Sequence, residues 1–136
     1  MSEQTDETRT FILNKLVRDR IPEINQAEGI QVDYELVQGE LKIFMLIKKL
    51  IEEAKECKVN LTAEELTDVY DVLGALVLEA GFTMSDISAI HTEKTEKLGD
   101  FTGGHFIKTL TVPNDSEWAH YYGADPHRFP EIIEGL

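Results

Sequence analysis

The fold is decided by residues 51–68, which read IEEAKECKVNLTAEELTD. Apolar residues recur at helical spacings of three and four on both sides of the short link 57–62, CKVNLT. Thr62 followed by Glu65 is typical of the first turn of a helix. Because the link is short, the two helices are expected to run antiparallel as a hairpin.

The surrounding sequence contains the same periodicity. Three long helices are predicted, at about residues 40–58, 63–80 and 84–98. Thr83 and Asp86 are placed to cap the third of them. Ile21-Pro22 can open a shorter helix, which Gly29 would end, because proline suits a first helical turn and glycine a C-terminal cap.

Outside these helices the chain has little regular pattern. Residues 31–37, QVDYELV, alternate like a short strand, and residues 106–112, FIKTLTV, are the best candidate for its partner. Residues 1–10 are expected to be a disordered lead-in and residues 113–136 an irregular tail that packs on the domain through its aromatic side chains. The predicted fold is mostly α, an antiparallel helical bundle with a minor two-stranded β pairing, in one domain over residues 11–112.

Composition limits the classes of partner. The net charge of −13 repels phosphate backbones and anionic lipid, so neither nucleic acid nor a membrane is the expected partner. Cys57 is the only cysteine, and the acidic start MSEQTDETRT does not resemble a secretory signal. A cytoplasmic location is therefore expected.

The acidic residues of the hairpin follow the helical period. At about 100° per residue, Glu53 lies at the edge of the apolar stripe of its helix, whereas Glu52 points mostly away from it. Glu65 and Asp68 share one rim of the next helix, because a spacing of three stacks side chains on one face. The hairpin can therefore bring these carboxylates together with Glu56.

Four carboxylates in a partly buried cleft would repel one another and lose hydration. A cation is the simplest remedy, and all-oxygen ligation suits Mg²⁺, with Mn²⁺ as a substitute. The alternative is a solvated acidic face, because runs of charge usually mark exposed helix surfaces.

Basic residues on both sides of the motif are candidates for binding phosphate. Lys15, Arg18 and Arg20 precede the first helix, where they could contact phosphate oxygens or be ordinary surface charges. Lys94 falls near the apolar stripe of its helix, with Lys97 close by, so Lys94 is expected to need a counter-charge.

The acidic motif, Glu52-Glu53-x-x-Glu56 followed by Glu65-x-x-Asp68, resembles that of the all-α NTP pyrophosphohydrolase superfamily, which includes MazG and phosphoribosyl-ATP pyrophosphohydrolase. Further stretches are similar to the opening and closing parts of one house-cleaning branch: NKLVRDRIPEI at 14–24 and KTEKLGDF at 94–101. The resemblance covers about residues 11–110.

The resemblance implies a MazG-like bundle in which four carboxylates bind magnesium: Glu53, Glu56, Glu65 and Asp68. It further implies that Glu52 is the base that deprotonates the attacking water. The helical wheel by itself gives Glu52 no such role.

The expected reaction is hydrolysis of a nucleoside triphosphate to the monophosphate and pyrophosphate, in house-cleaning of noncanonical nucleotides. Phosphoribosyl-ATP or dUTP is the alternative substrate, and a non-enzymatic acidic interaction module is the alternative function. A homodimer or homotetramer is expected, because the two long helices carry more apolar surface than one short chain can cover.

Overall fold

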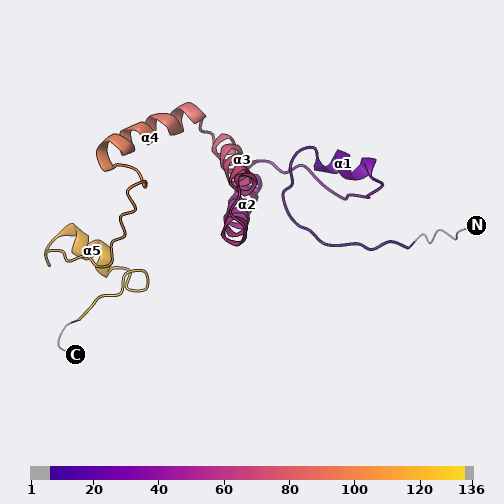
Figure 1. Cartoon of the computed structure of the whole chain (residues 1–136). Coiled ribbons are helices and arrows are strands. Elements are labelled where there is room, and N and C mark those ends of the chain that lie inside the picture. The colour runs from indigo at the N-terminus through magenta and orange to yellow at the C-terminus, as the bar shows by residue number, and fades with distance from the viewer. Residues whose placement is uncertain (1–6, 134–136) are drawn as a thin grey trace, which may run out of the picture. The chain divides into compact units, whose positions relative to one another are not determined.

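A computed structural model describes residues 7–133 and divides the chain into two compact units, Met1–Lys97 and Leu98–Leu136. Every regular element among the described residues is a helix, as Figure 1 shows, and the prediction of a mostly α fold is confirmed. The helices are α1 (Ile21–Ala27), α2 (Gly39–Val59), α3 (Ala63–Glu79), α4 (Met84–Leu98) and α5 (Glu117–Gly123).

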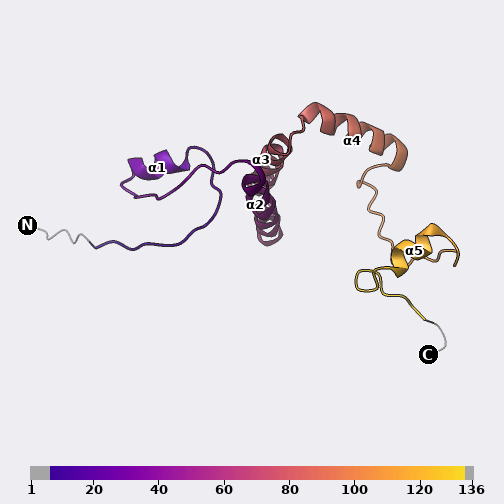
Figure 2. The same cartoon turned by 180° about the vertical axis from the view of Figure 1, so that it is seen from behind.

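The helices α2 and α3 form the predicted antiparallel hairpin and lie side by side in Figures 1 and 2. At its closed end, Thr62 caps α3 by accepting a hydrogen bond of 3.2 Å from the Glu65 N–H. At the open end, Glu79 accepts a hydrogen bond of 2.8 Å from the Gly39 N–H and pairs with Lys42 at 3.2 Å. Gly39 has a φ of +66°, a left-handed conformation that favours glycine.

The core of the hairpin is small. Among the described residues only Leu46 and Val77 are buried apolar side chains, and Glu53 is the only buried charged one. The large apolar side chains elsewhere on α2 and α3 are at least partly exposed. A single chain therefore buries less apolar surface than a domain of this size normally does.

Helix α4 begins as predicted, with a reciprocal capping box. The Asp86 N–H donates to Thr83 Oγ1 at 3.1 Å, and the Thr83 N–H donates to Asp86 Oδ2 at 2.9 Å. Gly81, with a φ of +87°, ends the preceding helix. In the part of the chain that the structure describes, α2 and α3 are the only helices that pack against each other, so α4 has no helical neighbour there.

No single helix within residues 7–133 is long and apolar enough to cross a membrane. The pair α3 and α4, which is bent by 109°, passes that test by length and composition when taken together.

The second unit contains α5 and an aromatic cluster. Ser116 caps α5 by accepting a hydrogen bond of 3.2 Å from the Ala119 N–H. The rings of the cluster contact one another with centroids 4.9–6.1 Å apart: Trp118, Tyr121, Tyr122 and Phe129. The tail thus packs through its aromatics among themselves and is more regular than expected, because Ser116 supplies a helix start.

The predicted β pairing is not seen, since neither 31–37 nor 106–112 is a strand in the described chain. An isolated pair of strands is marginal without a third strand or a helix to cover it. Of the expected lead-in, residues 7–10 are exposed and irregular, whereas residues 1–6 lie outside the described part. The domain boundary expected after residue 112 stays a prediction.

Candidate functional site

Three carboxylates meet at the closed end of the hairpin. Glu53 from α2 and Glu65 and Asp68 from α3 each offer one oxygen, and these oxygens all lie within 4.8 Å of one another. We call these three residues the carboxylate cluster. The spacing of three stacks Glu65 and Asp68 on one face of α3, and the inward face of α2 buries Glu53 to 9% exposure. The predicted inward direction of Glu53 is confirmed.

The close approach of these carboxylates makes their ionised forms less favourable. Burial raises the pKa of the Glu65 carboxyl above its ordinary value of 4.5, and the charges of Asp68, Glu56 and Glu53 raise it further. Burial also raises the pKa of the neighbouring Cys57 thiol, which stays protonated at neutral pH and is a poor nucleophile. A divalent cation bound by these hard oxygen donors would relieve the repulsion, so the donor set fits Mg²⁺ or Mn²⁺.

The fourth predicted ligand, Glu56, is not part of this trio in the structure. Its side chain is exposed, although it lies near enough to Glu65 to raise the pKa of that carboxyl. The wheel anticipates this difference, because it places Glu56 further from the apolar stripe than Glu53.

Glu52 is held by lysines and is not simply solvated. Lys15 Nζ donates to Glu52 Oε1 at 3.0 Å, and Lys49 Nζ lies 3.6 Å from the same oxygen. The hydrogen bond from Lys15 is the main cause that lowers the pKa of Glu52. Glu52 is therefore ionised at neutral pH and can accept a proton only against the pull of these two ammonium groups.

Lys49 is the residue that sequence reasoning missed. Its ammonium pairs with Glu53 at 3.2 Å as well as with Glu52, so one lysine joins the carboxylate cluster to the neighbouring carboxylate. The sequence contains a signal for these contacts: Glu52 and Glu53 follow Lys49 by three and four residues, and residues at these spacings are neighbours on a helix.

The basic residues that precede α1 divide by role. Arg18 Nη2 donates to Asp68 Oδ1 at 2.6 Å, and Arg18 Nη1 pairs with Asp71 Oδ2 at 2.9 Å. The guanidinium thus occupies one oxygen of a cluster member and fixes its direction. Arg20 pairs locally with Glu23 at 2.8 Å and makes no contact with the cluster.

Lys94 and Lys97 lie exposed on α4, and neither forms an ion pair with any described residue. The expectation that Lys94 is desolvated is wrong for the single chain, because no described helix packs on α4 to remove its water. Contact between these lysines and a phosphate stays a prediction.

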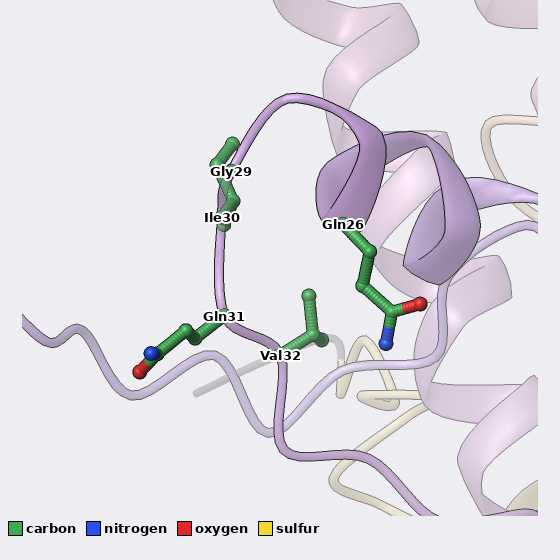
Figure 3. Close-up of a pocket in the computed structure, with 5 residues that line it drawn as sticks. All are labelled: Gln26, Gly29, Ile30, Gln31 and Val32. Carbon is green, nitrogen blue, oxygen red and sulfur yellow. The ribbon is translucent and has the colours of Figure 1, made fainter.

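Two cavities lie near the N-terminal half. One, of about 380 Å³, lies between the end of α1 and the segment that follows it, and it has no ionisable lining side chain; Figure 3 shows Gln26, Gly29, Ile30, Gln31 and Val32 around it. The other, of about 520 Å³, includes Lys15, Glu52 and Glu56 in its lining. Only the second brings charged groups of the sequence motif together.

Comparison of the chain with protein families, characterised proteins and solved structures gave no significant match.

Replacing Glu65 by Gln should stabilise the metal-free protein at neutral pH. A carboxyl whose pKa is raised in the folded state costs the protein no stability below its unfolded pKa, near 4.5. The loss of stability grows as the pH rises from that value through the folded pKa. Thermal melts in EDTA should therefore show a higher Tm for Glu65→Gln at neutral pH and equal Tm values in acid. A lower Tm for the variant at neutral pH would show that Glu65 is already compensated.

Proposed function

We propose that the protein is a magnesium-dependent nucleoside triphosphate pyrophosphohydrolase that releases a nucleoside monophosphate and pyrophosphate, in house-cleaning of noncanonical nucleotides. The observation that carries the proposal is the carboxylate cluster, in which Glu53, Glu65 and Asp68 bring three oxygens within 4.8 Å of one another. Burial and the neighbouring negative charges raise the pKa of Glu65 in this cluster. The order of these residues in the sequence, and their resemblance to the superfamily motif, support it.

In the proposed site each carboxylate has a distinct task. Glu53, Glu65 and Asp68 would hold the cation, with Glu56 turning in from the exposed side as the fourth ligand. When bound, Mg²⁺ would supply charge stabilisation for the phosphates and a water of lowered pKa. Arg18 would keep one oxygen of Asp68 engaged, so that the other faces the cluster.

Glu52 is the proposed base in the same scheme. It is ionised at neutral pH, because Lys15 and Lys49 lower its pKa, but the same contacts weaken it as a base. Movement of Lys15 onto a phosphate oxygen of the substrate would release Glu52 and restore its basicity. Lys94, Lys97 and Arg20 are proposed as further phosphate contacts.

A nucleotide panel tests the proposal. Standard and damaged nucleoside triphosphates, dUTP and phosphoribosyl-ATP would each be incubated with Mg²⁺ and assayed for pyrophosphate, with EDTA as the control. Release from at least one nucleotide, lost in EDTA, is expected. Uniform inactivity would favour the non-enzymatic acidic interaction module.

We further propose that the protein assembles as a homodimer or homotetramer. Exposed apolar side chains follow one another at helical spacing on α3: Leu66, Tyr70 and Leu73. Their exposed fractions range from 46% to 69%, and no other described helix covers them. Faces of this kind are typical of an interface between identical chains.

Light scattering should therefore give at least twice the mass of one chain at micromolar concentration. The double variant Tyr70→Glu/Leu73→Glu should shift the protein toward monomer, because charge would be buried at the interface. Val59→Glu/Leu61→Glu, an equal change at two exposed apolar residues at the closed end of the hairpin, should leave the mass unchanged. A wild-type monomer with full activity would contradict the shared-interface proposal.

A further inference from the structure

A groove lies between residues 14–16 and one face of α2, next to the carboxylate cluster. Its volume is about 520 Å³, within the range of about 300–1,000 Å³ common for small-molecule sites. The charged residues that line it are four lysines and two glutamates: Lys15, Lys48, Lys49, Lys55, Glu52 and Glu56. We call it the lysine groove.

The groove concentrates positive charge in a chain that is otherwise strongly acidic. Four of the thirteen basic residues line it, although the net charge is −13. Lys15 pairs with Glu52 at 3.0 Å, and Lys49 pairs with Glu53 at 3.2 Å and with Glu52 at 3.6 Å. Lys48 and Lys55, the other two lysines of the groove, have no carboxylate partner among the described residues.

The two unpaired lysines are placed to act together. They are seven residues apart on α2, which puts them on one face about 10.5 Å apart along the helix axis. The Lys48 ammonium lies 5.8 Å from the centre of the Phe44 ring, a contact that leaves its hydrogen-bond donors available. An anion with oxygens spread over more than one phosphorus atom suits such a pair better than a single small ion does.

Lys49 connects the groove with the cluster. Its ammonium contacts Glu52, which lines the groove, and Glu53, which belongs to the cluster. If one phosphate of a nucleotide lies at the cluster, the next phosphates of the same chain would therefore lie in the groove. From this juxtaposition we infer that the lysine groove binds the terminal pyrophosphate of a nucleoside triphosphate, with Lys48 and Lys55 as its ligands; the inference rests on the proposed function.

The test measures binding, so that it does not depend on turnover. Calorimetry with Mg²⁺ present would compare inorganic pyrophosphate and a nucleoside monophosphate on wild type and on Lys48→Ala/Lys55→Ala. The Kd for pyrophosphate should rise about tenfold or more, the scale of losing charge-assisted contacts, whereas the Kd for the monophosphate should stay within about twofold. Circular dichroism would verify that the helices of the variant are intact.

The matched control is Lys58→Ala/Lys108→Ala, which removes the same charge from exposed lysines that do not line the groove. It should leave both constants unchanged. The inference is overturned if wild type does not bind pyrophosphate, if the control loses as much affinity, or if the monophosphate is lost in place of pyrophosphate.

The calorimetric data, together with the pyrophosphate-release assay on the same variants, separate this inference from the proposed function. Lysine-dependent binding of pyrophosphate in a chain that hydrolyses no nucleotide would support the pyrophosphate site in the groove and contradict the proposed hydrolase activity. Hydrolysis that persists in Lys48→Ala/Lys55→Ala, with unchanged affinity for pyrophosphate, would support the proposed activity and contradict a pyrophosphate site in the groove.

Discussion

Replacement of Glu53 or Glu65 by Gln, or of Asp68 by Asn, should each lower kcat for magnesium-dependent hydrolysis by more than about a hundredfold. Residues that only support metal ligands typically cost about 10–100-fold when changed, so the loss of a ligand should exceed that range. Each amide keeps the side-chain volume and removes only the negative charge. The measurement is the steady-state rate of pyrophosphate release at saturating Mg²⁺.

The matched control for these variants is Glu64→Gln. Glu64 precedes Glu65 on α3, is exposed, and does not belong to the carboxylate cluster. It should retain nearly all of the activity, which would show that the loss depends on the cluster and not on net charge. Near-normal turnover in two of the three cluster variants would contradict the site.

Glu56→Gln separates the two versions of the site. The sequence motif makes Glu56 a fourth ligand, whereas the structure leaves its side chain outside the trio. A loss as large as that of the cluster variants would show that Glu56 turns inward when the cation binds.

Mg²⁺ or Mn²⁺ should raise the Tm of the wild-type protein by several degrees relative to EDTA. A ligand that binds only the folded state stabilises it by mass action, and at ten times the Kd the gain is about 1.4 kcal/mol. For a domain of this size that corresponds to several degrees. The cation also removes the like-charge repulsion that raises the pKa of Glu65.

Ionic strength must be matched with NaCl in this experiment, because a chain with a net charge of −13 gains stability from any added salt. The shift should disappear in Glu53→Gln and persist in Glu64→Gln. Equal midpoints in Mg²⁺ and in EDTA at matched ionic strength would instead support the solvated acidic face.

The helices could be predicted from the sequence because their causes are local. The spacing of apolar residues places α2, α3 and α4 to within about two residues, and the caps at Thr62 and Thr83 have the expected hydrogen bonds. The burial of Glu53 also follows from the helical period alone. These features depend on residues a few positions apart.

The contacts that complete the site could not be predicted in the same way. Lys15 meets Glu52 across 37 residues and Arg18 meets Asp68 across 50, so no periodic pattern relates them. The segment that carries Lys15 and Arg18 lies ahead of α1 and has no regular structure of its own there. The exposure of Lys94 was missed for a related reason, because a helical wheel identifies an apolar stripe but not whether anything covers it.

The proposed reaction is tested most directly by identifying the products formed from the best substrate of the nucleotide panel, by phosphorus NMR with Mg²⁺ present. We expect nucleoside monophosphate and pyrophosphate in equal amounts, and no reaction in EDTA. Formation of nucleoside diphosphate and inorganic phosphate, or an equal rate in EDTA, would contradict it.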